Sequence, residues 1–174
     1  MWISYIFLIP LFCIFALLQN SILAYFNIFG AYPNLVFVLF FTLIFFEGRD
    51  ERDTGFWFAI IAGFSLDIFS SSYFGLSVIS LAIIYFSKKF SKYFLKESTG
   101  EMTIFYFLPT FLIYFIVYNI SMYLLSIAFG LQRDLASITE IIATLVLNSI
   151  VAMAGFYIYN LFVKQKNNDQ LKLL

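Results

Sequence analysis

Histidine does not occur in this chain of 174 residues, and cysteine occurs once, as Cys13. Histidine is the commonest general base and the commonest transition-metal ligand, so its absence excludes Ser-His-Asp catalysis and zinc peptidase chemistry. A single cysteine cannot form an internal disulfide. Cys13 lies in an apolar run without a charged neighbour that would stabilise a thiolate, and we interpret it as a small buried hydrophobic side chain.

Charge is also scarce. Only 11% of the residues are charged, less than half of the about 25% that is typical of soluble domains. Hydrophobic residues make up 63% of the chain, phenylalanine alone occurs 25 times, and the mean hydropathy is +0.94. A soluble fold of this size could not hide so much apolar surface, and disordered chains are poor in apolar residues. The composition therefore predicts an integral membrane protein.

The apolar runs predict an all-helical protein with one domain, a compact bundle of six transmembrane helices over residues 1–163. The first run lacks the basic region that opens a signal peptide, so we interpret it as an uncleaved helix. We expect the polar tail, 164–174, to be frayed. The expected helices are 2–26, 34–46, 54–70, 73–90, 102–129 and 138–163.

The second and third of these runs are short for a bilayer span of about 20 residues. A re-entrant hairpin would explain their length, but it would place the charged segment 47–53 inside hydrocarbon. Each charge there costs about 2.5 kcal/mol or more. We therefore favour two short spans with local thinning of the bilayer.

Polar residues predict where several helices begin. Asn34 precedes the second apolar run and fits an N-cap. The segments 98–101 and 137–140 both match the capping box, in which a serine and a glutamate three residues later bond reciprocally to backbone N–H groups. This motif explains Glu140 without any catalytic role.

The basic residues predict the orientation of the chain. With both termini in the cytoplasm, nine of the ten basic residues lie in cytoplasmic segments, and only Arg133 lies in an outer loop. The outer loops are short, so we expect the protein to act mainly through its helix faces and its partners. The nine cytoplasmic residues are Arg49, Arg52, Lys88, Lys89, Lys92, Lys96, Lys164, Lys166 and Lys172.

Asp67 is the only acidic residue well inside an expected span. One interpretation is a proton or cation site or an anchor for a partner helix, because a buried carboxylate needs a partner. The other is that Asp67 lies close enough to the helix end to reach water or the 70–72 turn. Gly55, Ala59 and Gly63 precede it at every fourth position, and this spacing predicts a close helix-packing face. That face could serve packing within the chain or the docking of a partner.

The last two expected helices carry amides that could join them. Asn148 lies on a face of the sixth helix with small residues, and Asn119 lies on the fifth helix among tyrosines. Buried amides need hydrogen-bond partners, so we expect these two helices to pair there. A small-molecule pocket is the alternative. Gln19 and Asn20 have a comparable position near the outer end of the first helix.

The chain contains no motif for catalysis. A phosphate-binding loop, a nucleophile elbow, a calcium-binding loop and the nucleic-acid modules are all missing from the sequence. The serines have no matching base in the sequence. We therefore expect no enzymatic activity, no cofactor, no metal and no nucleic-acid partner.

The first half of the chain resembles the rod shape-determining protein MreD, a family of small polytopic bacterial membrane proteins of about this length. The resemblance depends on the order and spacing of short motifs around the first four helices. Asn34 stands where many members carry aspartate, and the second half offers no matching motif. The matching residues are Gln19, Gly30, Pro33-Asn34-Leu35, Gly63-Phe64-Ser65-Leu66-Asp67 and Gly75-Leu76.

The resemblance implies a non-enzymatic scaffold in the bacterial cytoplasmic membrane that controls cell shape and lateral peptidoglycan synthesis. Its implied partners are an MreC-like single-pass protein, an MreB-like actin homologue, a RodA-like glycosyltransferase and a class B penicillin-binding transpeptidase, besides membrane lipid. The family is also similar in fold to the substrate-binding subunits of energy-coupling-factor vitamin transporters.

Such a transporter subunit is the alternative function. The face formed by Gly55, Ala59 and Gly63 would then dock the coupling subunit of the transporter. A vitamin pocket would need several convergent polar groups. The outer third of the bundle offers Gln19, Asn20, Asn27, Asp67, Arg133 and Asp134.

Overall fold

The computed structural model describes residues 2–46, 54–69, 73–94, 104–131 and 137–171. Over these residues the protein is helical throughout, apart from turns and one isolated backbone bridge, which confirms the predicted all-helical class. It has six α-helices and one π-helical segment that continues the first of them. Their bounds are α1 Trp2–Leu17, η1 Leu18–Leu23, α2 Leu35–Phe46, α3 Thr54–Phe69, α4 Leu76–Phe94, α5 Ile104–Ala128 and α6 Ile138–Leu171.

Several helix ends differ from their predicted positions by one to eight residues, and three of them are informative. The first helix ends as η1 at Leu23, three residues early. The fourth helix begins at Leu76, because Tyr73–Gly75 form a turn in which the N–H of Leu76 donates to the carbonyl of Tyr73 at 3.4 Å. The sixth helix continues to Leu171, so the predicted fraying from 164 onward was wrong. That segment contains neither glycine nor proline, and an established helix gains one hydrogen bond for each residue added.

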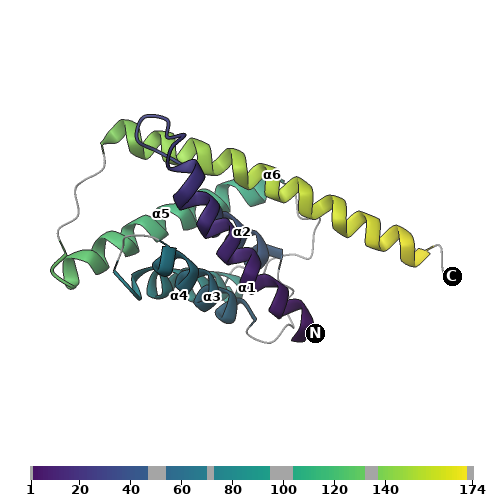
Figure 1. Ribbon diagram of the computed structural model, residues 1–174. Helices are drawn as coiled ribbons and strands as arrows, with labels where there is room; N and C mark the ends of the chain where they lie inside the picture. The colour runs from purple at the N-terminus through teal and green to yellow at the C-terminus, as the bar shows by residue number, and fades with distance from the viewer. Residues whose placement is uncertain (1, 47–53, 70–72, 95–103, 132–136, 172–174) are drawn as a thin grey trace.

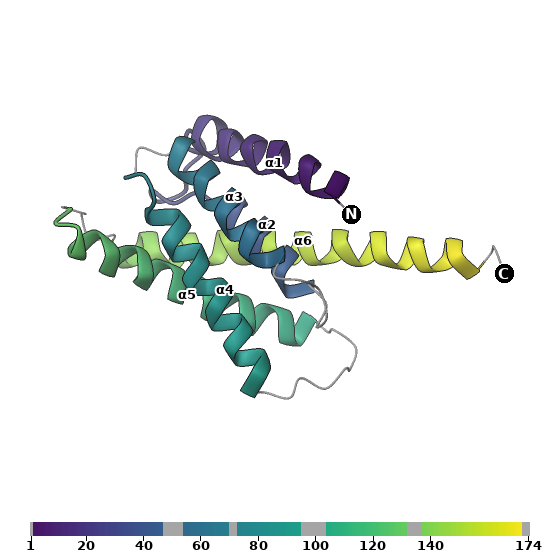
Figure 2. The same ribbon diagram turned by 90° about the horizontal axis from the view of Figure 1, so that it is seen from below.

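Helices α3 and α4 lie side by side as an antiparallel pair in both views (Figures 1 and 2). Helix α6 is the longest, and its C-terminal end projects beyond the other helices in both views. Helix α1 packs against α3 and α2. The bundle is therefore uneven, with a closely packed pair on one side and a long helix on the other.

The core lies around α2, which contacts α1, α3, α5 and α6. Phenylalanine rings fill the space between α2 and α5. The Phe41 ring lies 5.3 Å from that of Phe111, edge to face, and the Phe37 ring lies 5.4 Å from that of Phe115. Such pairs are favourable beyond their buried area. Phenylalanine side chains thus fill the interior of the bundle and also lie exposed on its surface.

Two helical segments are long and apolar enough to cross a membrane, Ile104–Ala128 and Ile138–Leu161. At about 1.5 Å of rise for each residue, both exceed the roughly 30 Å of a bilayer core. Many of their large apolar side chains are exposed, including Ile116 and Ile150. These features support a membrane location.

Candidate functional site

Asp67 is the buried acid that the sequence singles out, and it caps a neighbouring helix. It lies in the last turn of α3 with 4% of its surface exposed. Its Oδ2 accepts the backbone N–H of Gly75 at 2.7 Å, and its Oδ1 accepts that of Ser77 at 3.1 Å. Gly75 has a φ of +97°, which favours glycine, and its carbonyl accepts the first helical bond of α4. Both carboxylate oxygens are thus bound by the N-terminus of α4.

The stripe of small residues on α3 packs within the chain. Gly55, Ala59 and Gly63 are all buried. A Cβ atom on Gly63 would lie 2.4 Å from the Cα of Val78 in α4, a distance that would force the two backbones apart. Of the two predicted uses of this stripe, Gly63 therefore serves packing between α3 and α4, and the absence of its side chain lets Asp67 reach the start of α4.

Asn34 caps α2, as predicted. Its Oδ1 accepts the N–H of Phe37 at 2.9 Å, and its carbonyl accepts the first helical bond of α2. The N–H of Asn34 donates to Oδ1 of Asn148 at 2.7 Å, and Nδ2 of Asn148 donates to the carbonyl of Thr144 on its own helix. Asn148 is fully buried. It therefore joins α6 to the beginning of α2.

Helices α5 and α6 pack against each other as predicted, but the expected contact through Asn148 and Asn119 was wrong. Asn119 is exposed and donates to the carbonyl of Phe115 on its own helix. Helices α5 and α6 meet instead through apolar rings, with Phe107 and Phe156 at 4.9 Å between centroids. The reason is that α2 lies against both helices and presents the open N–H of Asn34 to α6.

Lys88 makes a contact between helices that was not predicted from the sequence. The lysine was predicted only to lie with other basic residues in a cytoplasmic segment, and in the structure it is buried. Its Nζ donates to the carbonyl of Ile44 in the last turn of α2 and lies 5.4 Å from the ring centre of Phe45. A cation is favourable at a helix C-terminus. Lys88 lies four and seven residues after the buried Ile84 and Leu81, so helical periodicity places all three on one face of α4. This spacing could have indicated that Lys88 is buried.

Gln19 lies in the π-helical segment η1 with 6% of its surface exposed. Its Oε1 is buried and has no hydrogen-bond partner among the described residues. The neighbouring Asn20 donates to the carbonyl of Ala16, and Asn27 donates to that of Ala24. Among the outer polar residues that the structure describes, Asn20 and Asn27 thus bond locally and Asp67 bonds to a helix end, and no bond joins one of them to another.

Residues Ile28–Ala31 form a tight hairpin turn in the segment between the first two predicted helices, where a turn was expected. The backbone groups of Ile28 and Ala31 exchange two hydrogen bonds of 2.9 and 3.0 Å. Phe29 and Gly30 both have positive φ, +54° and +81°, as a type I′ turn requires. Such a φ is a rare conformation for a bulky residue such as Phe29. Gly30, which the resemblance includes, is thus needed by the turn.

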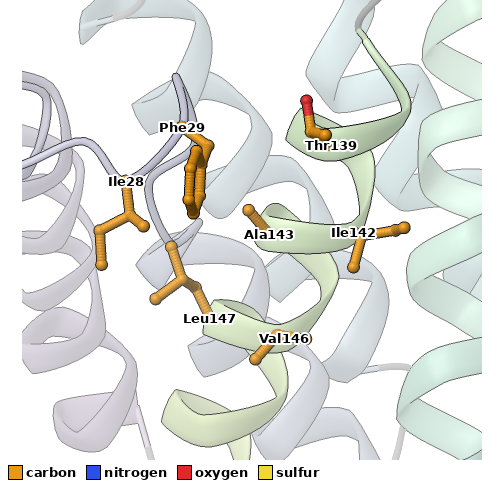
Figure 3. Close-up of a pocket in the computed structure, with 7 residues that line it drawn as sticks. All are labelled: Ile28, Phe29, Thr139, Ile142, Ala143, Val146 and Leu147. Atoms are coloured by element: carbon orange, nitrogen blue, oxygen red, sulfur yellow. The ribbon is translucent and has the colours of Figure 1, made fainter.

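The hairpin and α6 border a groove of about 430 Å³. Figure 3 shows the Phe29 ring over the face of α6 that carries Ala143 and Leu147. Ser137 caps α6 as predicted, because its Oγ accepts the N–H of Glu140 at 3.2 Å. The reciprocal half of the predicted capping box, a bond from Ser137 N–H to the Glu140 carboxylate, is not formed between these two described residues. The Glu140 side chain lies against the hairpin: a Cβ atom on Gly30 would be 3.9 Å from its Cγ and Cδ. The groove is lined by Ile28, Phe29, Thr139, Ile142, Ala143, Val146 and Leu147.

Several predicted features lie outside the described residues. These are the charged turn 47–53, the 70–72 turn, the capping box at 98–101, and Arg133 with Asp134. Within the described residues, no three side chains among aspartate, glutamate and cysteine lie close enough to hold a metal ion. The described residues offer exposed apolar helix faces and the groove as binding surfaces.

No family model, curated protein or solved structure matches this chain. The class that the fold defines is a helical bundle with two helices fit to cross a membrane.

Proposed function

We propose that the chain is a polytopic protein of the bacterial cytoplasmic membrane with six helical spans and both termini in the cytoplasm. The apolar surfaces of α5 and α6 support this proposal, because a water-exposed helix would not carry so many isoleucines outward. The distribution of basic residues supports the orientation. The nearly unbroken helix from Trp2 to Leu23 has the length of another span.

Cysteine labelling tests this topology. In a Cys13→Ser background, single cysteines at Asn27 and Asn167 would lie on opposite sides of the membrane. A membrane-impermeant maleimide added to intact cells is expected to modify Asn27→Cys at once and Asn167→Cys only after permeabilisation. Modification of both sites from the same side would contradict this topology, which places an odd number of spans between them.

Within the membrane the protein acts as a non-enzymatic scaffold of the MreD kind, whose helix faces bind partners of the cell-elongation machinery. The observation that supports this proposal is where polar and apolar side chains lie. Buried polar side chains such as Asp67 and Asn148 bond within the fold, whereas many large apolar side chains are exposed on its surface. Asn34, Asp67 and Asn148 bind helix ends. Four residues of the resembling motifs, Asn34, Gly63, Asp67 and Gly75, also lie at these junctions, as expected if the motifs maintain a shared fold.

The substrate-binding subunit of a vitamin transporter is the second candidate. The buried, unpartnered Oε1 of Gln19 favours it, because such an acceptor could bind a polar ligand. Against it, the groove at Phe29 is lined by apolar side chains and Thr139, and Asn20 and Asn27 bond to their own segments. The distribution of described polar groups therefore favours the scaffold.

Co-purification of the full chain from its native membranes tests the proposal. Recovery of an MreC-like single-pass protein would support the scaffold, and recovery of two ATPases with a coupling subunit, or of a bound vitamin, would replace it with the second candidate. Two triple-alanine variants would locate the face. One replaces Ile113, Ile116 and Ile120 on α5, and the other replaces Ile142, Ile150 and Ile158 on α6.

All six isoleucines in these two variants are exposed, so thermal stability is expected to stay close to that of the parent. One variant is expected to lose the partner and the other to keep it. Retention of the partner by both variants would contradict binding through these faces.

A further inference from the structure

The groove beside the Ile28–Ala31 hairpin has the dimensions of a single extended chain. It follows α6 from Thr139 to Leu147, a rise of about 12 Å. Dividing about 430 Å³ by that length gives a cross-section of about 36 Å². A hydrocarbon chain would fit along the groove.

The walls of the groove continue into the exposed face of α6. Ile142 and Val146 line the groove and are both about half exposed, and Ile138 and Ile150 extend the apolar surface along the same helix. In the membrane orientation proposed above, this surface faces lipid. The occupant would therefore enter sideways from the bilayer.

The hairpin holds Phe29 in place over α6 at a conformational cost. The turn is fixed by two backbone hydrogen bonds between Ile28 and Ala31, and it keeps Phe29 in the left-handed region. Asparagine or glycine would adopt that backbone more easily. The ring is largely exposed in this structure and directed along α6 (Figure 3), so it covers the groove without filling it.

One carboxylate lies where the groove meets the hairpin. Glu140 follows the lining residue Thr139 and lies against Gly30, which follows the lining residue Phe29. Its backbone N–H is bound by Ser137, but its half-buried carboxylate forms no hydrogen bond or ion pair with any described residue. A carboxylate beside an apolar groove, without a partner among the described residues, complements a molecule with a cation at the end of a hydrocarbon chain.

We propose that the groove binds an ethanolamine phospholipid, with one acyl chain along α6 and the ammonium group at Glu140. The ammonium supplies a charge and three N–H donors to the carboxylate, as a lysine head would. A glycerol headgroup would instead bring the lipid phosphate toward Glu140 without a cation. This proposal rests on the membrane location proposed above and does not depend on the scaffold role.

Fluorescence quenching by brominated lipids tests the proposal with the full chain in lipid nanodiscs. Trp2 and Trp57 are replaced by phenylalanine, and Phe29→Trp places a single reporter in the groove. Phosphatidylethanolamine and phosphatidylglycerol with identical chains compete, and only one of them is brominated in each sample. We expect the Phe29→Trp reporter to select the ethanolamine lipid about three- to fivefold, the factor of a partly exposed ion pair.

Adding Glu140→Gln is expected to remove the preference while the acyl chain still quenches the reporter in the groove. Ile150→Trp, in place of Phe29→Trp, is the matched control on the same helix outside the groove, and it should show no preference. Equal quenching of the groove reporter by both lipids, or a preference unchanged by Glu140→Gln, would overturn the proposal.

Comparison of the two reporters separates the remaining outcomes. An unquenched Phe29→Trp reporter beside a quenched Ile150→Trp reporter would also overturn the proposal, because it would indicate a groove closed or filled by protein. Absence of quenching at both positions would instead contradict the membrane location on which the proposal rests.

Discussion

The α3–α4 pair and α6 are held in this fold in different ways. Helices α3 and α4 touch through their backbones at Gly63 and Val78, and the carboxylate of Asp67 binds the first N–H groups of α4. Helix α6 packs through one narrow stripe, and within its apolar segment Ile138–Leu161 only Asn148, Ala152 and Phe156 are buried. The α3–α4 pair therefore stabilises the fold, whereas most of the surface of α6 faces the surroundings of the protein.

The two regions should therefore respond differently to substitution. A helix of 16 residues such as α3 is marginal by itself and depends on tertiary packing. The 34 residues of α6 form many more internal hydrogen bonds, so losing one contact should leave the helix intact. Matched substitutions in the two regions measure this contrast.

The largest effect is expected for Gly63→Ala. The added methyl group would lie 2.4 Å from the Cα of Val78, so α3 and α4 must separate, at a cost of about 3 kcal/mol or more. Thermal unfolding in detergent measures the loss. Reaction of the native Cys13 with a maleimide would report it locally, because the Cys13 sulfur lies 3.8 Å from Ser65 on α3.

Gly155→Ala is the control on α6. Its methyl group would lie 3.4 Å from Oγ1 of Thr42, an ordinary contact, and the gain in helix propensity offsets any small shift. We expect a change of less than about 1 kcal/mol. Equal losses for the two alanines would show that α6 is packed as tightly as α3 and would remove the contrast.

A smaller loss is expected for Asp67→Ala, because the N–H groups of Gly75 and Ser77 would lose their acceptor inside the protein. We expect about 2–3 kcal/mol, and about half of that for Asp67→Asn, which keeps one acceptor oxygen. The local cap of α6 provides the comparison: Ser137→Ala should cost about 1 kcal/mol. Thermal unfolding measures all three variants, and stability in Asp67→Ala equal to that of the parent would contradict a capping role.

The smallest effect is expected for the asparagines. Asn148→Leu removes the acceptor of the Asn34 N–H and should cost about 1–2 kcal/mol. Asn119→Leu removes only a bond within its own helix and should stay within about 0.5 kcal/mol of the parent. Denaturant unfolding followed by circular dichroism separates these values. A loss of stability in Asn119→Leu larger than about 0.5 kcal/mol would instead support the predicted role of Asn119 in the contact between α5 and α6.

The features that sequence reasoning predicted correctly are local. The apolar runs indicate the number and approximate bounds of the helices, and Asn34 and Ser137 cap helices that begin one residue later. Each of these caps joins atoms three residues apart, so the pattern of nearby residues contains the whole interaction. The end of α6 was misjudged, because a polar composition does not stop a helix that lacks glycine and proline.

The features that sequence reasoning missed join distant segments. The hydrogen bond between Asn34 and Asn148 spans 114 residues, and that between Lys88 and Ile44 spans 44. Asp67 was recognised as unusual, but its partners could not be chosen between water, a partner protein and the chain itself. The groove at Phe29 requires a hairpin and a helix from opposite ends of the chain.

By itself the sequence determined how much apolar surface must be kept from water, because 63% of the residues are hydrophobic and only 11% are charged. Only the tertiary structure decided which neighbour each buried polar group bonds to. Asp67 binds the start of α4, Asn148 binds the start of α2, and Lys88 binds the end of α2. The physical reason is how far apart along the chain the interacting residues lie. Hydrophobicity and helix capping act within a few residues along the chain, whereas a hydrogen bond between helices depends on how their axes pack.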